Sequence, residues 1–163
     1  MNKKIVIVLV ASGVLFLVVA AAVIGWLVVL VKRSPETYVV PGAQIAERHL
    51  REIDELGILA EGEEILLFYS DALIDLTEGM YLATDRRLVL YDDEWEQPLL
   101  SAPFDSIQDV QAEWDSSFLV DSRLSVTLAN GEVWAFPVSS EGGGDRWFYG
   151  FLRHRAGLEP EPR

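Results

Sequence analysis

The sequence predicts a mainly β (α+β) fold: about seven short antiparallel strands, a C-terminal helix, a preceding amphipathic helix and one N-terminal transmembrane helix. Three observations predict it: an uncharged run at 5–31, segments of two-residue period or short apolar runs over 65–138, and helical apolar spacing on both sides of them. We expect the strands to form one small, strongly bent sheet or barrel, whose open end the last helix covers.

The uncharged run is apolar on every face, so as a helix it reserves no stripe for a soluble core. A helix over 5–31 would be about 40 Å long, whereas the hydrocarbon core of a bilayer is about 30 Å thick. The alanines at 20–22 also suit a cleaved secretory signal, but strong hydrophobicity continues past them to Val31, and Trp26 with Lys32-Arg33 is typical of interfacial anchors. We therefore predict a retained membrane anchor with basic flanks over 1–33, followed by a linker over 34–42.

All 26 acidic residues lie after this run, and with nine arginines they give residues 34–163 a net charge of −17. That balance disfavours nucleic acid and anionic lipid headgroups as partners, because both need clustered cations. The acids are scattered among apolar residues, which favours a folded acidic domain over a disordered tail. The absence of cysteine excludes disulfides and thiolate metal sites.

Basic residues near the ends of the run bear on its orientation. Two precede it (Lys3, Lys4) and four follow it (Lys32, Arg33, Arg48, Arg51). The positive-inside rule therefore favours a cytoplasmic domain on a single-pass protein of the cell membrane. The lysines and the terminal amine at the other end oppose this, so a periplasmic or extracellular location stays an alternative.

Residues 43–56, within the segment 43–60, have the spacing of an amphipathic helix. The expected apolar face consists of Ala46, Leu50, Ile53 and Leu56. Gly57 followed by Ile58 is typical of a left-handed C-terminal cap. We expect this helix to pack on its own domain.

Seven strands are then expected, separated by Gly, Asp, Asn, Ser and Pro. They cover Ile65–Tyr69, Met80–Thr84, Leu88–Tyr91, Leu99–Ala102, Ile107–Ala112, Leu124–Ala129 and Val133–Val138. For the last hairpin we predict a three-residue loop, 129–131, with Gly131 left-handed in a bulge. That register sets Val126 opposite Trp134 and Leu124 opposite Phe136, whereas a two-residue Asn130-Gly131 turn would place the aromatic residues on the polar face.

A final helix is predicted from Arg146 to Ala156, with Asp145 as its N-cap and Gly157 just past its end. Its apolar face would consist of Trp147, Phe148, Phe151 and Leu152. Residues 158–163 are expected to be a flexible tail.

The run Gly79–Tyr91 contains Leu82-Ala83-Thr84-Asp85-Arg86-Arg87, and Pro103–Val110 contains a proline followed by spaced apolar residues. With the Asn130-Gly131 hairpin and the aromatic helix, these segments make residues 61–157 resemble the bacterial pleckstrin-homology-like (PH-like) and GRAM-like domains. Thr84, Asp85, Arg87, Asn130 and Gly131 are the residues that carry this resemblance.

The resemblance implies a binding module. Eukaryotic relatives often hold phosphoinositides through Lys and Arg in the loop between the first strands, and bacterial relatives serve as protein-interaction or oligomerisation modules. In this chain the corresponding loop, Ser70–Gly79, carries Asp71, Asp75 and Glu78 and no cation. Repulsion of an anionic headgroup is therefore expected.

Several motifs have both a chemical and a structural interpretation. The acidic run Asp92–Glu96 suits either a calcium ion or a solvated hairpin tip, and the second is favoured because the twelve-residue loop of an EF-hand is missing. Arg86 and Arg87 suit a phosphate or local ion pairs. His49 and His154 are predicted to be surface or helix-packing residues. We predict no catalytic residue, no cofactor and no metal.

The segment 113–121 carries large apolar residues in a polar frame between two strands, and Trp95 lies in the preceding acidic tip. Trp114, Phe118 and Leu119, with Trp95, are candidate partner contacts, since exposed aromatic residues commonly anchor partners. The alternative, that this segment caps the core, stays open. We thus expect a membrane-anchored interaction or assembly module that binds a protein partner or itself; a lipid-sensing module and an accessory domain of an envelope complex are the alternatives.

Overall fold

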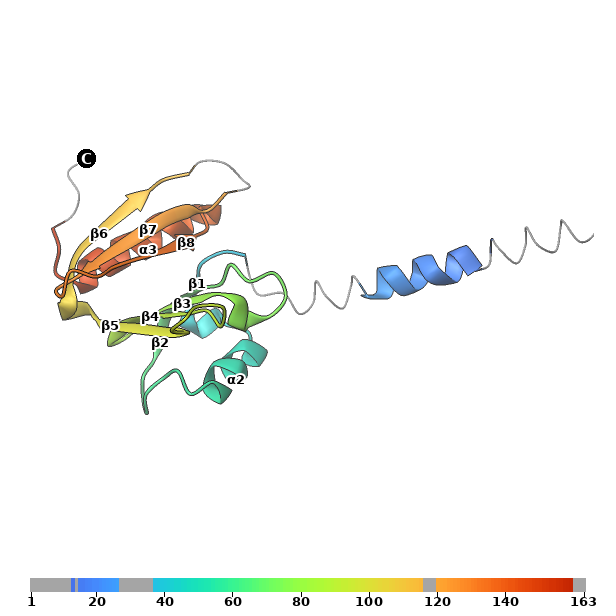
Figure 1. The fold of residues 1–163 in the computed structure, drawn as a ribbon, viewed down its shortest axis with the longest axis horizontal. Coiled ribbons are helices and arrows are strands. Elements are labelled where there is room, and N and C mark those ends of the chain that lie inside the picture. The colour runs from blue at the N-terminus through green and yellow to red at the C-terminus, as the bar shows by residue number, and fades with distance from the viewer. Residues whose placement is uncertain (1–12, 14, 27–36, 116–119, 160–163) are drawn as a thin grey trace, which may run out of the picture. The chain divides into compact units, whose positions relative to one another are not determined.

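Residues 13, 15–26, 37–115 and 120–159 are described in this computed structural model. The chain divides into two units, Met1–Ser34 and Pro35–Arg163, which are treated separately. In the first unit, residues 15–26 are helical (Figure 1). None of the helices in the described ranges is both long enough and apolar enough to cross a membrane. The anchor predicted at 5–31 extends at both ends outside the described residues.

The described part of the second unit contains eight strands and two α-helices. In chain order these are β1 (Val40–Pro41), α2 (Glu47–Glu55), β2 (Ile65–Tyr69), β3 (Met80–Thr84), β4 (Arg87–Tyr91), β5 (Leu99–Pro103), β6 (Ile107–Glu113), β7 (Ser122–Leu128), β8 (Val133–Val138) and α3 (Gly144–Arg155). The seven predicted strands are confirmed with ends that differ by at most two residues. The additional strand, β1, lies in the segment predicted as a linker.

The strands form two antiparallel sheets, one in the order β1-β2-β3-β4-β5 and the other in the order β6-β7-β8. The expected antiparallel strands with a C-terminal helix are confirmed, but the described strands form two sheets rather than a single bent sheet or barrel. Between β5 and β6 the chain passes through Pro103 and a 3₁₀ turn at Phe104–Ser106. Proline has no N–H to donate to a ladder, and the turn redirects the chain, so the second sheet starts anew.

The strands β2, β3 and β4 of the five-stranded sheet are largely buried on both faces, whereas β5 is mostly exposed. On β3, Tyr81 and Ala83 face a core shared with the three-stranded sheet and α3, whereas Met80 and Leu82 face a second core that includes Ile53 of α2. We call the first the main core. Figure 1 shows the resulting layers, with α2 on the side of this sheet that faces away from β6–β8. Burial on both faces explains why these strands are short apolar runs rather than alternating ones.

Helix α2 begins at Glu47, not at residue 43, because residues 42–44 form a 3₁₀ turn. Its inward face also differs from the predicted one. Ile53 is buried as expected, but its inward neighbour one turn earlier is His49, which stacks on Phe68 with 6.3 Å between ring centroids. Leu50 lies 40% exposed. Helix α2 thus starts later than predicted, and it turns His49 rather than Leu50 toward the sheet.

The β7–β8 hairpin has the predicted register, with Val126 opposite Trp134 and Leu124 opposite Phe136. Gly131 has a φ of 86°, and its N–H donates to the carbonyl of Leu128. The three-residue loop with a left-handed glycine is thereby confirmed.

Helix α3 begins at Gly144, and its N-cap is Gly143, so the prediction of Asp145 as N-cap is wrong. Asp145 instead lies buried in the first turn, where its carboxylate accepts a 2.6 Å hydrogen bond from the Ser122 hydroxyl at the start of β7. A carboxylate in the first turn is favoured by the helix dipole. Phe148 and Leu152 enter the main core.

Candidate functional site

A cavity of about 530 Å³ opens where three loops of the second unit meet. We call it the loop-end cavity. It is lined by Thr37, Tyr69, Ser70, Asp71, Ala72, Leu73, Val120, Asp121, Ser139, Ser140 and Glu141. The lining thus comes from the end of β2 and the loop after it, from the residues before β7, and from the segment between β8 and α3, with Thr37 added from the segment before β1.

One wall of the cavity is held by a tyrosine–carboxylate contact. The Tyr69 hydroxyl donates to the Asp121 carboxylate, which ties the residues before β7 to the end of β2. Burial raises the pKa of Tyr69 far above its usual range, and the Asp121 carboxylate raises it further. The hydroxyl therefore keeps its proton and remains a donor to Asp121.

A second tyrosine–carboxylate contact lies beside the first, since the rings of Tyr69 and Tyr81 stack with 6.0 Å between their centroids. The Tyr81 hydroxyl forms a side-chain hydrogen bond with Asp71, and burial raises the pKa of both groups, while this bond partly offsets the rise for Asp71. A β-carbon at position 79 would lie only 2.1 Å from Asp71 Oδ1, so the close approach of this carboxylate requires Gly79. The Ser70 hydroxyl donates to the Gly79 carbonyl over 2.6 Å, which closes the same loop.

The charges around the loop-end cavity have one sign. Its lining includes Asp71, Asp121 and Glu141, and within the described ranges 37–115 and 120–159 it includes no lysine, arginine or histidine. The acidic loop between the first long strands therefore contributes to a carboxylate-lined cavity. Such a site attracts cations and repels anions.

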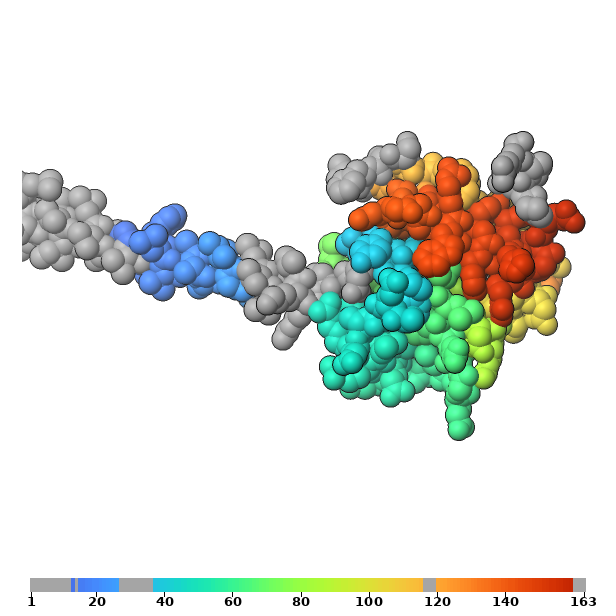
Figure 2. Space-filling view, turned by 180° about the vertical axis from the view of Figure 1, so that it is seen from behind, coloured from blue at the N-terminus to red at the C-terminus, as the bar shows by residue number. Residues whose placement is uncertain are grey.

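A smaller cavity of about 360 Å³ adjoins this one at Glu141. We call it the aromatic cavity, because its lining includes Tyr38 and Trp147, which are 43% and 46% exposed. Val39 packs closely against Gly144 here. A β-carbon on Gly144 would lie only 2.8 Å from Val39 Cγ2. Figure 2 shows the segment near residue 40 (cyan) lying against C-terminal residues (orange to red).

The candidate partner contacts are placed as follows. Trp95 is half-buried and packs against the main core. Trp114 is 38% exposed; it stands edge-on to Tyr149 at 5.1 Å, and the Arg146 guanidinium lies 4.3 Å from its ring centroid. Phe118 and Leu119 lie outside the described residues, so the choice between core cap and partner contact for 113–121 stays a prediction.

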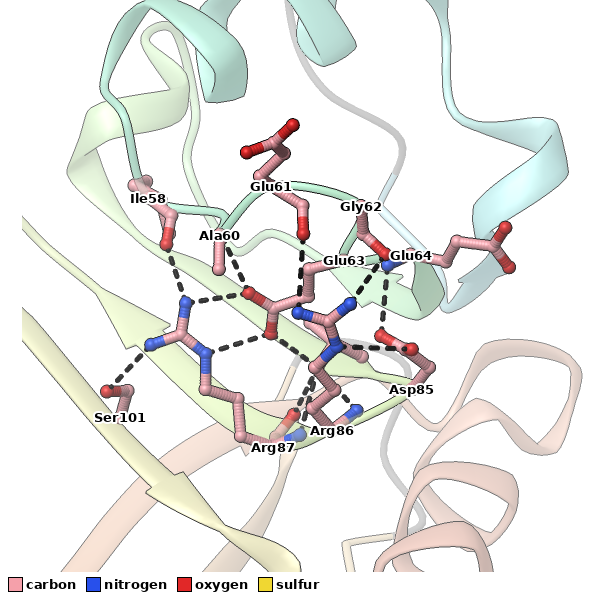
Figure 3. Close-up of polar contacts among 11 residues, drawn as sticks. Ile58, Ala60, Glu61, Gly62, Glu63, Glu64, Asp85, Arg86, Arg87 and Ser101 are labelled. Atoms are coloured by element: carbon pink, nitrogen blue, oxygen red, sulfur yellow. Dashed lines mark hydrogen bonds and ion pairs between the residues drawn. The ribbon is translucent and has the colours of Figure 1, made fainter.

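The sequence motif at the β3–β4 turn builds a second polar cluster (Figure 3). The Arg87 guanidinium makes a two-pronged contact with Glu63, in which Nε and Nη2 each donate over 2.8 Å. Nη2 also donates to the Ile58 carbonyl at 2.9 Å, and Nη1 donates to the Ser101 hydroxyl at 3.1 Å. Arg87 thereby joins the segment after α2 to β4 and β5.

Thr84, the last residue of β3, completes this cluster. Its hydroxyl donates to Glu63 Oε1 over 2.8 Å and accepts the N–H of Arg87 at 2.9 Å. Asp85 accepts the N–H of Glu64 at 3.0 Å, and Arg86 reaches the Gly62 carbonyl. The interpretation of the arginines as local ion-pairing residues agrees with these contacts. Glu63 was not singled out from the sequence, because no local pattern marks an acid that pairs 24 positions later.

The carboxylate of Glu63 predicts a specific pH dependence. The hydrogen bonds from Arg87 lower its pKa to about 2 from 4.5, in spite of burial. Because the folded pKa is the lower one, the stabilisation is complete above about pH 4.5 and is lost as the pH falls toward 2. We expect the free energy of unfolding to fall less on acidification in the Glu63→Gln variant than in the unchanged protein, by on the order of 2 kcal/mol. Urea unfolding between pH 6 and pH 2.5 measures this, and parallel profiles of the two proteins would contradict it.

The remaining chemical motifs are placed without forming a site. In the described ranges, no group of three or more His, Asp or Glu side chains is arranged to hold a metal ion. In the acidic tip, the Glu94 N–H donates to Asp92 Oδ1 and the Trp95 N–H donates to the Asp92 carbonyl. His154 is exposed on α3, whereas the His49 side chain is buried between α2 and the five-stranded sheet. No catalytic constellation is evident in this part of the chain.

No protein-family model matches this chain, and no curated protein sequence does. Its structure is similar to a DUF1696-family protein with a pleckstrin-homology domain from Shewanella loihica PV-4, with a TM-score of 0.51 and 18% identity. The match covers 74% of this chain and 99% of that protein. The chain has a PH-like fold.

A pleckstrin-homology domain from Shewanella amazonensis SB2B is also similar, with a TM-score of 0.48, 18% identity, and coverage of 68% of this chain and 96% of that one. At this identity the first match speaks for the fold alone. The PH-like resemblance of Thr84, Asp85 and Arg87 is thereby supported at the level of architecture. These residues act in the structure as the ties of the β3–β4 turn.

Proposed function

We propose that this protein is a single-pass, membrane-anchored PH-like module that binds a protein partner or assembles with itself, without catalytic activity. The PH-like fold supports a binding role. The apolar run at 5–31 and its basic flanks support attachment to the cell membrane, and the positive-inside rule supports a cytoplasmic domain.

The loop-end cavity is the observation that carries this proposal. It is a concave surface of about 530 Å³ that combines carboxylates with apolar walls from Ala72, Leu73 and Val120. Recognition sites commonly combine an apolar lining with a few placed polar groups. Its carboxylates favour a protein ligand over an anionic lipid.

Photocrosslinking of the full-length protein in its own membrane tests the proposal. A photoreactive amino acid replaces Leu73, which lines the cavity and is 80% exposed. The control position is Val133, which is 61% exposed at the start of β8. We expect a protein adduct of defined mass from position 73 and none from position 133. Lipid adducts alone would favour the lipid-sensing alternative, and identical patterns from both positions would refute a specific surface.

Trp114 offers a separate test of the 113–121 segment. The Trp114 ring is only partly exposed and contacts the Tyr149 ring and the Arg146 guanidinium. Trp114→Ala should therefore lower the free energy of unfolding by about 1–2 kcal/mol. If the segment contacts a partner, the same change weakens co-purification of the crosslinked protein at least tenfold, as does Phe118→Ala. Trp95→Ala provides a comparison from the acidic tip. Unchanged co-purification in all three variants would remove these residues from the partner surface.

A further inference from the structure

The loop-end cavity and the aromatic cavity meet at Glu141, which lines both. Together they form a continuous surface with carboxylates at one end and exposed rings at the other. We call it the carboxylate–aromatic face, and its defining residues are Tyr38, Asp71, Asp121, Glu141 and Trp147. Among the residues that the structure describes, no lysine, arginine or histidine lines either cavity.

The carboxylates of this face have acceptor capacity beyond their bonds to the tyrosines. Asp121 and Asp71 accept bonds from the Tyr69 and Tyr81 hydroxyls, whereas an ionised carboxylate offers about four acceptor positions. These bonds fix the position of each carboxylate without neutralising it. Glu141 accepts a long, 3.5 Å bond from the Thr37 hydroxyl.

The charges also leave an unbalanced repulsion. The burial of Asp71 and the nearby charge of Asp121 both raise the pKa of Asp71, which means that its charged form is held at a cost. A cation in the cavity would relieve this repulsion. A metal ion is a poor candidate, since the described residues contain no cluster arranged for one.

The exposed rings select the kind of cation. Tyr38 and Trp147 present aromatic surface beside Glu141, which suits a guanidinium or ammonium group placed against a ring. Ala72, Leu73 and Val120 provide apolar walls for the aliphatic part of a long basic side chain. An extended segment would allow successive basic side chains to reach both cavities.

We propose that the carboxylate–aromatic face binds a basic peptide segment of a protein partner, with an arginine or lysine side chain in the loop-end cavity and a second one against Tyr38 and Trp147. This rests on the proposed function and names the chemistry of the partner. Charge complementarity with a domain of net charge −17 would also speed the encounter.

Peptide titration of the full-length protein in phosphatidylcholine nanodiscs tests this. The probe is a fluorescent eight-residue peptide of alternating arginine and serine, followed by anisotropy at physiological salt. We expect saturable binding, and we expect no binding of the matched peptide of alternating glutamate and serine. Binding to vesicles that contain phosphatidylglycerol, without binding of the arginine peptide, would overturn the proposal.

Matched triple variants separate the face from general electrostatics. Asp71→Asn, Asp121→Asn and Glu141→Gln remove three charges from the face with little change in shape. The control, Asp105→Asn, Glu132→Gln and Glu52→Gln, removes three exposed charges elsewhere, because Asp105 and Glu132 lie at the opposite end of β6–β8 and Glu52 lies on α2. We expect at least tenfold weaker binding for the first and less than twofold for the second. Equal losses would overturn the proposal.

Two further variants complete the design. Trp147→Ala should weaken binding about two- to fivefold, as expected for an exposed cation–π contact. Glu141→Gln alone should weaken binding about threefold. It keeps the test valid if the triple variant does not fold, because the one bond described for the Glu141 side chain is the long one from Thr37. Failure of the arginine peptide while the position-73 crosslink persists would refute this inference alone, whereas loss of the crosslink specificity would refute the proposed function.

Discussion

Arg87→Met is expected to lower the free energy of unfolding by about 3–5 kcal/mol, the range for breaking a buried ion pair on one side only. The Glu63 side chain is fully shielded from solvent, and its charge would lose both prongs of the guanidinium contact. The carbonyl of Ile58 would lose its donor as well. Since a domain of this size has about 5–15 kcal/mol in total, this one change removes a large share of it. Urea unfolding followed by pulse proteolysis of the full-length protein measures the effect.

Arg86→Met is the matched control, because the neighbouring arginine is half-exposed and donates to backbone carbonyls at the surface. Its loss should cost no more than about 1 kcal/mol. Pairing Arg87→Met with Glu63→Met should recover most of the lost stability, since no buried charge is then left without a partner. A double variant as unstable as Arg87→Met would show that the arginine acts through its other contacts.

Phe148→Ala is expected to cost about 3–5 kcal/mol, as for other fully buried aromatic residues. Phe148 is completely buried on α3 and meets Phe136 of β8 edge-on, with 5.9 Å between ring centroids. Its ring fills the main core at the point where α3 and both sheets converge. The truncation therefore leaves a void that neighbouring strands cannot close without moving.

Trp147→Ala provides the comparison for Phe148→Ala, since it removes a larger ring from the adjacent position of the same helix. Trp147 is nearly half exposed, so this change should cost about 1 kcal/mol. Urea midpoints of the two variants give the difference. A cost for Trp147→Ala equal to that for Phe148→Ala would mean that α3 is held chiefly by its outer face.

The two stability predictions concern different ties of the same PH-like domain. Arg87 fixes the segment after α2 to the five-stranded sheet, and Phe148 fixes α3 to the main core. Neither residue lines the loop-end cavity. Variants of the carboxylate–aromatic face can therefore be compared with them to separate loss of binding from loss of fold.

Much of the strand pattern was predictable because the signals are local. The β7–β8 register follows from Asn130-Gly131 and the two-residue period of the flanking strands, and Gly57, Gly131 and Gly157 all have positive φ as their positions beside turns and helix ends suggested. At the end of α3 the Leu158 N–H donates to the Arg153 carbonyl, as in a Schellman cap. Such features depend on residues only a few positions apart.

The predictions that failed concern packing between distant segments. Asp145 fits the N-cap pattern, but its partner, Ser122, is 23 residues earlier, and the helix instead starts after Gly143. The apolar spacing of α2 predicts Leu50 as an inward residue, whereas the sheet receives His49 and Ile53. An amphipathic pattern allows several rotations of a helix, and the surface it meets selects one.

The sequence by itself determined the order of the elements, the hairpin geometry, the acidic character of the domain and an apolar run suited to a membrane. Those properties follow from local periodicity, turn chemistry and summed charge. Only the tertiary structure decided that the strands split into two sheets, that Glu63 pairs with Arg87, and that Asp71, Asp121 and Glu141 surround one cavity. The ion pair and the cavity bring together residues 20 or more positions apart, and their proximity arises from how whole segments pack, which no short stretch of the chain encodes.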